Sequence, residues 1–400
     1  MAVWDDLVGQ QRVEEQLAAA ARDADALVTA QAAGEPDPEA SKMTHAWLFT
    51  GPPGAGRVDA ARAFAAALQC VSPDRALGGV PGCGFCTGCH TVLVGTHADV
   101  TTVSAVGTEI LVKDMRDTVR KSFTSPANGR WQVILVTDAE RLNEKSANAV
   151  LKAVEEPAPR TVWLLCAPSV EDVLPTIRSR CRHLTLRTPP VEAVADVLIR
   201  RDGIEPEAAH AAARATQGHV DRARRLATDE RARARRAVVL KLPLRVADIG
   251  GCLKAAQELV DAAAEDAKQV AEEVDTKETE ELKAALGAVQ GGRMPRGTAG
   301  LMKELEDKQK RRGRRTQLDS LDLALTDLTG FYRDVLTLQL GTRSALANED
   351  VRDAVERIAR DTTPERTLRR VEAVLACREA LERNVAPLLA VEAMTMALRD

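Results

Sequence analysis

Aromatic residues are scarce in this 400-residue sequence, at only 2% of the chain. Because apolar residues still make up 45%, the cores must be built mainly from Ala, Leu and Val, which favours helices with a few Val-rich strands. No run approaches the roughly 18 apolar residues of a membrane span. The first residues carry acids and no apolar run, which is unlike a signal peptide. We therefore expect a soluble, cytoplasmic protein with no membrane contact.

An excess of positive charge is also lacking. Lys and Arg total 55 against 59 Asp and Glu, which gives a net charge of −4. This balance excludes a polycation that coats nucleic acid, so any DNA contact must be a local patch or come through partners. At roughly 150 residues per domain, the length predicts two or three domains.

Short apolar runs alternate with helical patterns in the first half of the chain. This alternation predicts an α/β domain with a parallel sheet and helices on both faces. The expected strands are residues 45–50, 99–106, 131–137, 161–167 and 183–186. Beyond Pro189 and Pro190 the pattern is helical, with segments at 191–200, 205–216 and 221–227 and then a long helical region to residue 400. The charged stretch 266–316 indicates two exposed helices around a loop at Gly291, Gly292 and Pro295, or else partial disorder.

A glycine-rich segment follows the first expected strand and opens a helix over residues 57–68. Gly51, Gly54 and Gly56 have the spacing of a phosphate-binding loop, whose backbone N–H groups can cradle a polyphosphate. Arg57 stands where such loops have lysine, and Val58 where they have the hydroxyl that binds Mg²⁺. Val cannot ligate a metal, so ATP binding by this chain is in doubt. The alternative is a strand-to-helix turn without a ligand.

Asp138 ends the third expected strand, where hydrolysing enzymes of this type place Asp and then Glu to hold Mg²⁺ and polarise water. Here Ala139 follows, and Glu140 comes one position late, so we expect it to point elsewhere. Hydrolysis needs charge stabilisation and a positioned water, so we expect the site to be inert or nearly so. The alternative for Asp138 is a helix cap or strand-end turn.

Four cysteines cluster at Cys70, Cys83, Cys86 and Cys89. Four thiolates suit tetrahedral Zn²⁺, and a set in which protein fills every position is typical of structural zinc. An iron–sulfur cluster is the alternative, but the ferredoxin-type fourth Cys-Pro is missing. His90 and His97 are alternative ligands, while Gly82, Gly84 and Gly88 supply permissive turns. We expect the lone cysteines Cys166, Cys252 and Cys377 to be small buried hydrophobes.

Arg180 lies in the segment Ser179-Arg180-Cys181, between the last two expected strands. An arginine there is often simply solvated. After the fourth strand of a nucleotide-binding sheet, however, an arginine at a subunit interface can reach the γ-phosphate bound by a neighbour.

Together these residues resemble the AAA+ clamp-loader family, and within it the delta-prime type of subunit of the bacterial DNA polymerase III holoenzyme. The resemblance covers residues 1 to about 230, and beyond that it depends on helical character and length. It is carried by residues 4–10, 45–54, the cysteine cluster, 95–100, 138–143, 147–152, 155–157 and 179–181. The departures at Arg57, Val58 and Ala139 favour this type over the ATPase subunits. Asp221 stands where the ATPases have a sensor arginine, with Arg222 one place late.

The resemblance implies an AAA+ sheet domain over 1–188 with a zinc module at 70–89, a helical lid over 189–240 and a helical collar over 241–400. It implies a non-hydrolysing subunit that joins gamma/tau and delta subunits, donates Arg180 to a neighbour's ATP site, and helps open the sliding clamp and load it on primed DNA.

Two other functions remain open at this point. One is an active clamp-loader ATPase of the gamma/tau type, which would need a lysine in place of Arg57 and a hydroxyl side chain in place of Val58. The other is a zinc-dependent nucleic-acid binding module, which would want basic and aromatic residues near the cysteines, where the sequence offers Arg75 and Phe85. The basic run 308–315 could touch DNA inside a ring, although such runs are more often solvated helix faces.

Overall fold

The computed structural model describes residues 2–34, 41–77, 79–105, 107, 109–127, 129–285, 299–342 and 344–399. Contacts divide the chain into two compact units. The first contains residues 1–105, 109–213 and 217–224, and the second contains residues 225–400 with the short segments 106–108 and 214–216. The expected domain boundaries at 188 and 240 remain predictions. Among the described helices, none is both long and apolar enough to cross a membrane.

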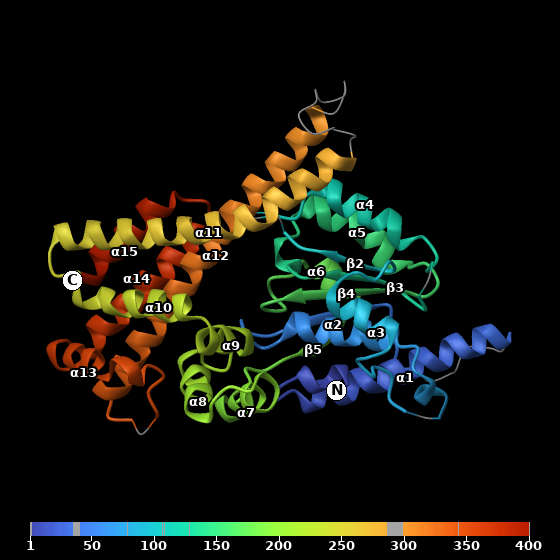
Figure 1. Ribbon diagram of the computed structural model, residues 1–400, viewed down its shortest axis with the longest axis horizontal. Coiled ribbons are helices and arrows are strands. Elements are labelled where there is room, and N and C mark those ends of the chain that lie inside the picture. Colours follow the sequence, from blue (N-terminus) through green and yellow to red (C-terminus); the bar gives the residue numbers. More distant parts are fainter. Residues whose placement is uncertain are drawn as a thin grey trace. The chain divides into compact units, whose positions relative to one another are not determined.

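The first unit contains a sheet of five parallel strands (Figure 1). The strands are β1 (Ala46–Thr50), β2 (Val100–Val103), β3 (Gln132–Val136), β4 (Thr161–Ala167) and β5 (Arg182–Thr185). Their order is β2-β3-β4-β1-β5, so β1 pairs with β4 on one side and β5 on the other. All five predicted strands are confirmed, and they form the predicted parallel sheet. The runs flanking β2 and β3 were predicted too long because apolar residues continue past the last ladder hydrogen bonds.

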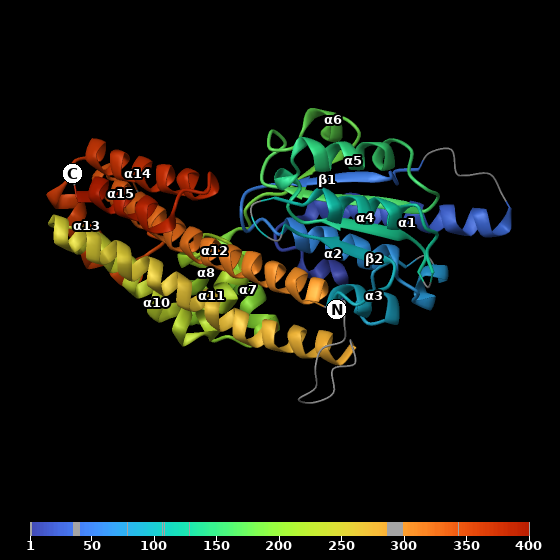
Figure 2. The same ribbon diagram turned by 90° about the horizontal axis from the view of Figure 1, so that it is seen from above.

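Helices cover both faces of this sheet, as Figures 1 and 2 show. On one face Trp47 and Phe49 of β1 pack with α1 (Gln11–Ala33), α2 (Arg57–Leu68) and α3 (Thr87–Val94). On the other, Ala46 and Leu48 pack with the helices α4 (Val112–Ser122), α5 (Glu144–Glu155) and α6 (Pro175–Arg178). The alternation of side chains along a strand divides each strand between two cores. Alanines dominate α2, and all four tryptophans of the chain are buried. Most of the few aromatic residues therefore lie in the cores.

The rest of the chain is helical. Its helices are α7 (Val191–Asp202), α8 (Pro206–Ala215), α9 (Val220–Thr228), α10 (Glu230–Lys241), α11 (Ile249–Ala285), α12 (Ala299–Gln339), α13 (Arg352–Asp361), α14 (Pro364–Glu382) and α15 (Pro387–Arg399). Within the second unit, α11 and α12 lie side by side as a long hairpin (Figures 1 and 2). The predicted pair of charged helices is confirmed, whereas Gly291, Gly292 and Pro295 fall outside the described residues. Leu325, Phe331 and Tyr332 of α12 anchor the core of this unit.

Candidate nucleotide and metal sites

The glycine-rich loop between β1 and α2 has the backbone of a phosphate-binding loop. Gly54 and Gly56 have φ angles of 85° and 78°, which favour glycine. A Cβ on Gly51 would lie 2.6 Å from the carbonyl oxygen of Leu186, and one on Gly54 would lie 2.8 Å from the His219 ring. The loop therefore needs glycine at these positions both for its conformation and for close contact with neighbouring segments.

The two side chains that end this loop, Arg57 and Val58, contact other parts of the protein. The Nη1 of Arg57 donates a hydrogen bond to the carbonyl oxygen of Gly51, within the same loop. Val58 is half-buried and packs against the core that α2 shares with the sheet. Arg57 is thus turned back on its own loop, and Val58 offers no oxygen to a metal ion.

A cavity of about 560 Å³ lies beside the loop. Its lining includes Gln10, Arg57, Arg62, His219, Asp221 and Arg224. Burial lowers the pKa of His219, and the nearby charge of Arg222 lowers it further. Arg224 is held by Asp202 at 2.7 Å and Asp221 at 3.0 Å. A carboxylate therefore faces the cavity from the position where the sequence comparison expected a sensor arginine.

The carboxylate of Asp138 ties together the ends of two strands. Its Oδ2 accepts hydrogen bonds from the backbone N–H of Ala105 at 3.0 Å and from the hydroxyl of Thr137 at 2.9 Å. It occupies the cap position of the short 3₁₀ turn Ala139–Arg141, but its side chain makes no capping hydrogen bond there. Asp138 thus makes structural contacts with the segments that follow β2 and β3.

Glu140 lies in the short 3₁₀ turn after β3. Burial raises the pKa of its carboxyl, the charge of Asp138 raises it further, and Arg57 acts in the opposite direction. Its Oε2 is buried without a hydrogen-bond partner among the described residues. Its Oε1 lies 3.9 Å from the Nε of the neighbouring Arg141, so the side chain is buried beside the turn that follows β3.

The four clustered cysteines meet in space. The sulfurs of Cys70, Cys83, Cys86 and Cys89 all lie within 4.8 Å of one another. Backbone N–H groups point at two of these sulfurs. Val71 and Cys89 donate to the Sγ of Cys86, each at 3.4 Å, and Cys86 donates to the Sγ of Cys83 at 3.3 Å. Such hydrogen bonds orient thiolates and offset their charge, as is typical of a ligand set around a cation.

Glycines shape the segment that carries the cysteines, in two different ways. Gly82 and Gly84 have φ angles of 107° and 84° and make the turns around Cys83. Gly88 lies inside α3, where a Cβ would come within 1.9 Å of the carbonyl oxygen of Gln69. The predicted turn role is therefore right for Gly82 and Gly84 and wrong for Gly88, which instead lets α3 approach the end of α2.

The cysteine segment is also fastened to the start of the chain. The Val3 N–H donates to the carbonyl of Gly82 and the Trp4 indole N–H donates to that of Pro81, both at 2.9 Å. His97 accepts a hydrogen bond from the backbone of Asp99 at 3.1 Å. Among the described residues the ligand cluster consists of the four cysteines alone, without His90 or His97.

Arg180 lies just after α6, on a part-exposed turn. Its Nη2 is 2.5 Å from the Oε1 of Glu155, the last residue of α5. Its Nη1 donates to the carbonyl of Thr176 at 2.7 Å and to the hydroxyl of Ser179 at 3.2 Å. The side chain remains 38% exposed, so the guanidinium is both ordered and accessible.

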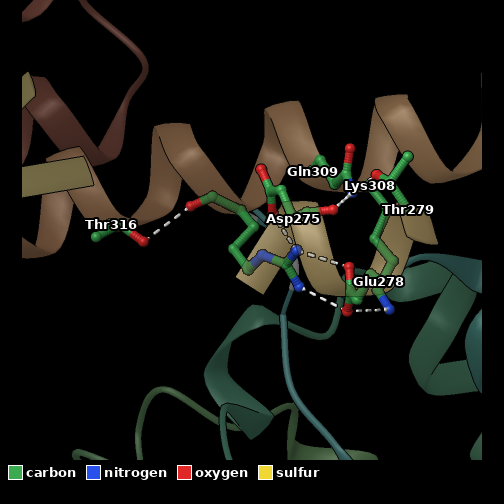
Figure 3. A network of polar contacts seen from close by, with 7 residues as sticks. Asp275, Glu278, Thr279, Lys308, Gln309 and Thr316 are labelled. Carbon is green, nitrogen blue, oxygen red and sulfur yellow. Dashed lines mark hydrogen bonds and ion pairs between the residues drawn. The ribbon is translucent and has the colours of Figure 1, made fainter. Parts of the chain in front are cut away.

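The basic run 308–315 is largely engaged within the helical hairpin. Figure 3 shows Lys308 and Gln309 of α12 facing Asp275, Glu278 and Thr279 of α11. Lys308 lies 3.7 Å from Glu278, and Arg312 pairs with both Asp275 and Glu278. Hydrogen bonding from Arg312 lowers the pKa of Glu278. At least two of these cations therefore neutralise α11.

The other cysteines bear out the expectation of small buried hydrophobes. Cys166, Cys252 and Cys377 are all buried and lie in the apolar cores. Burial raises the pKa of the Cys377 thiol to about 11 and that of Cys181 to about 12. These thiols are therefore poor nucleophiles at neutral pH.

Comparison with known proteins gives two family matches. The family described as DNA polymerase III, delta subunit matches residues 35–190, and its C-terminal counterpart matches residues 316–396. These segments contain the phosphate-type loop, the cysteine cluster, Arg180 and most of the C-terminal helices.

Curated relatives agree with these families. The delta-prime subunit of Pseudomonas aeruginosa DNA polymerase III is 35% identical over 168 residues, which are 42% of this chain and 50% of the relative. That of Escherichia coli is 34% identical over 182 residues, 45% of this chain and 53% of the relative. The gamma/tau subunit of Mycobacterium tuberculosis is 31% identical over 163 residues, 40% and 28% respectively. The chain thus spans about half or less of the relatives it matches. Over residues 35–190 and 316–396 the chain therefore matches the DNA polymerase III delta-subunit families, and its relatives include both delta-prime and gamma/tau subunits of that polymerase.

Proposed function

We propose that this chain is a non-hydrolysing subunit of a DNA polymerase III clamp loader that donates Arg180 to the ATP site of a neighbouring subunit. In that role it assembles with gamma/tau-type and delta-type subunits and helps to open the sliding clamp and load it on primed DNA. The domains at 1–188, 189–240 and 241–400 would serve as sheet domain, lid and collar.

The observation that carries the proposal is the hydrogen bond from Arg57 to Gly51. A cation that should meet the phosphates of a bound nucleotide is instead held by its own loop. Val58 offers no metal ligand, and Asp138 is engaged by Ala105 and Thr137. Phosphoryl transfer depends on placing Mg²⁺, a water and positive charge around the transferred group. This arrangement lacks the Mg²⁺ ligand, which favours an inert site over an active ATPase.

The four cysteines fit one structural Zn²⁺. All four positions of a tetrahedral ion would be filled by protein, which leaves no open position for a water or a substrate. The metal would hold together a segment with little apolar core of its own, and Cys70 joins it to the end of α2.

A nucleic-acid binding role for the cysteine segment gains little support. Arg75, its basic residue, pairs with Asp25 and donates to the carbonyl of Cys70. Phe85 is 73% exposed, but a single aromatic without free cations is a poor platform for a nucleic-acid strand.

Reconstitution of the loader with an Arg180→Ala subunit tests the proposed function. The variant should assemble normally, and ATP hydrolysis and clamp loading should both fall, because a charge opposite the transferring phosphoryl group is lost. The matched control is Arg200→Ala, since Arg200 is an exposed arginine that also contacts a carbonyl four residues back. Wild-type hydrolysis and loading by the assembled Arg180→Ala complex would show that Arg180 is a surface residue only.

A further inference from the structure

Glu155, the partner of Arg180, carries a negative charge at a position that disfavours one. Glu155 is the last residue of α5, and the C-terminal end of a helix disfavours a negative side chain. The carboxylate is 42% exposed and lies against the Nη2 of Arg180. An exposed ion pair of this kind contributes only about 0–1 kcal/mol to folding, so stability alone is a weak reason for the arrangement.

The contacts of Arg180 leave part of its guanidinium available. Thr176 and Ser179 take the Nη1 and Glu155 takes the Nη2. The Nε–H forms no hydrogen bond with any residue that the structure describes. Guanidinium groups bind phosphate through neighbouring N–H groups in a fixed fork. A side chain held along one edge can therefore still offer N–H groups to a phosphate oxygen.

We propose that Glu155 is a positioning residue for Arg180. It restrains the guanidinium in the orientation from which Arg180 meets the γ-phosphate held by the adjacent subunit, so that the long side chain is already ordered when the interface forms. This inference rests on the proposed role of Arg180. It adds a second residue to that role, one that acts through Arg180 and does not touch the nucleotide.

The expected loss of turnover without Glu155 follows from the entropy of ordering the Arg180 side chain. Immobilising one long side chain at an interface costs an amount equivalent to about a twofold to tenfold change in rate. Glu155 and Thr176 supply that ordering before the neighbour arrives. Removing the carboxylate should therefore lower the turnover of the neighbouring site by about twofold to tenfold, with little change in the KM for ATP, because the arginine acts on the transition state.

The test uses a reconstituted loader in which the other ATP sites are inactivated in their own phosphate loops, so that only the site facing Arg180 turns over. The subunits to compare are wild type, Glu155→Ala, Glu155→Gln, Arg180→Ala and the double variant Glu155→Ala/Arg180→Ala. Glu155→Gln keeps one oxygen acceptor and should retain more turnover than Glu155→Ala. The matched control is Glu156→Ala, because Glu156 is exposed and carries the same charge at the next position. Gel filtration checks that each complex assembles.

The double variant separates positioning from independent action. If Glu155 acts through Arg180, the double variant turns over at the rate of Arg180→Ala alone. Losses that multiply, a rate unchanged in Glu155→Ala, or a rate that rises would each overturn the positioning role while leaving the role of Arg180 in place. If Arg180→Ala itself has no effect, the proposed function and this inference both fail.

Discussion

The phosphate-type loop and the cysteine segment differ in whether their side chains match the backbone shape that each adopts. The loop retains its glycine conformations at Gly54 and Gly56, yet its side chains contact their own backbone and core. The cysteine segment has both glycine turns and a full set of four sulfurs within 4.8 Å. Backbone shape and side-chain chemistry are thus separable. A backbone with the shape of a phosphate-binding loop can therefore occur without the lysine and hydroxyl side chains that usually accompany it.

The largest expected effect concerns the four-cysteine segment. Cys86→Ser removes one of four ligands, and because metal binding supplies folding free energy to such segments, the variant should lose both the metal and thermal stability. Purified wild-type protein should contain about one zinc per chain by elemental analysis. Cys181→Ser is the control, since Cys181 packs beside α6 and away from the cluster. Unchanged zinc in Cys86→Ser would remove Cys86 from the ligand set.

A smaller loss should follow from crowding the same segment without touching a ligand. Gly88→Ala places a Cβ against the carbonyl of Gln69, and overpacking of this kind costs about 1–3 kcal/mol of unfolding free energy. Gly313→Ala in α12 is the control because nothing lies within 4 Å of the added Cβ. Denaturant unfolding measures both. Equal stability of the two variants would mean that α3 is free to shift away from α2.

Placing the usual lysine and hydroxyl side chains on the phosphate-type loop tests whether its backbone can support nucleotide binding. The double variant Arg57→Lys/Val58→Thr supplies a phosphate-binding amine and a Mg²⁺-binding hydroxyl on an unchanged backbone. We expect wild-type protein to show no ATP turnover above background, and the double variant to gain about tenfold in Mg²⁺-ATP affinity, about 1.4 kcal/mol. Calorimetric titration measures the affinity. Strong Mg²⁺-dependent hydrolysis by the wild-type chain would overturn the non-hydrolysing assignment.

The smallest expected effect is a titration at the edge of the loop. His219 has a folded pKa below its usual 6.5, so the folded state binds fewer protons than the unfolded state between these two values. The stability due to neutral His219 is fully present above about pH 6.5 and is lost as the pH falls through the folded pKa. The NMR titration of the His219 ring gives this value directly. Arg222→Ala should raise the folded pKa of His219. A wild-type pKa equal to the usual 6.5 would mean that the ring is solvated.

Sequence alone located the strands, the glycine loop and the four clustered cysteines, because each has a characteristic residue pattern or spacing within a short segment. The expected strands failed only at their ends, where apolar residues continue beyond the hydrogen-bond ladder. The packing role of Gly88 could not be deduced, since it depends on a residue distant in the sequence. Gly88 meets the backbone of Gln69 at the end of α2.

Partnerships across long sequence separations were also beyond the sequence. Nothing in the triplet 179–181 signals that Glu155 holds Arg180, because the pair depends on the packing of α6 against α5. The basic run 308–315 likewise looked like free charge. Its partners Asp275 and Glu278 are recognisable only once α11 and α12 are paired in register.

The strand order has a consequence for how the chain folds as it is made. β1 pairs with β4 and β5, beginning at Ala46 with Trp163 and at Trp47 with Arg182. Residues 70–89 leave the ribosome well before either partner exists, and synthesis adds only about 5–20 residues per second. The cysteine segment can therefore close around a metal while β1 is still unpaired. If the four cysteines bind zinc as proposed, the supply of zinc during translation would decide whether the unpaired β1 lies beside an ordered segment or beside four free thiols.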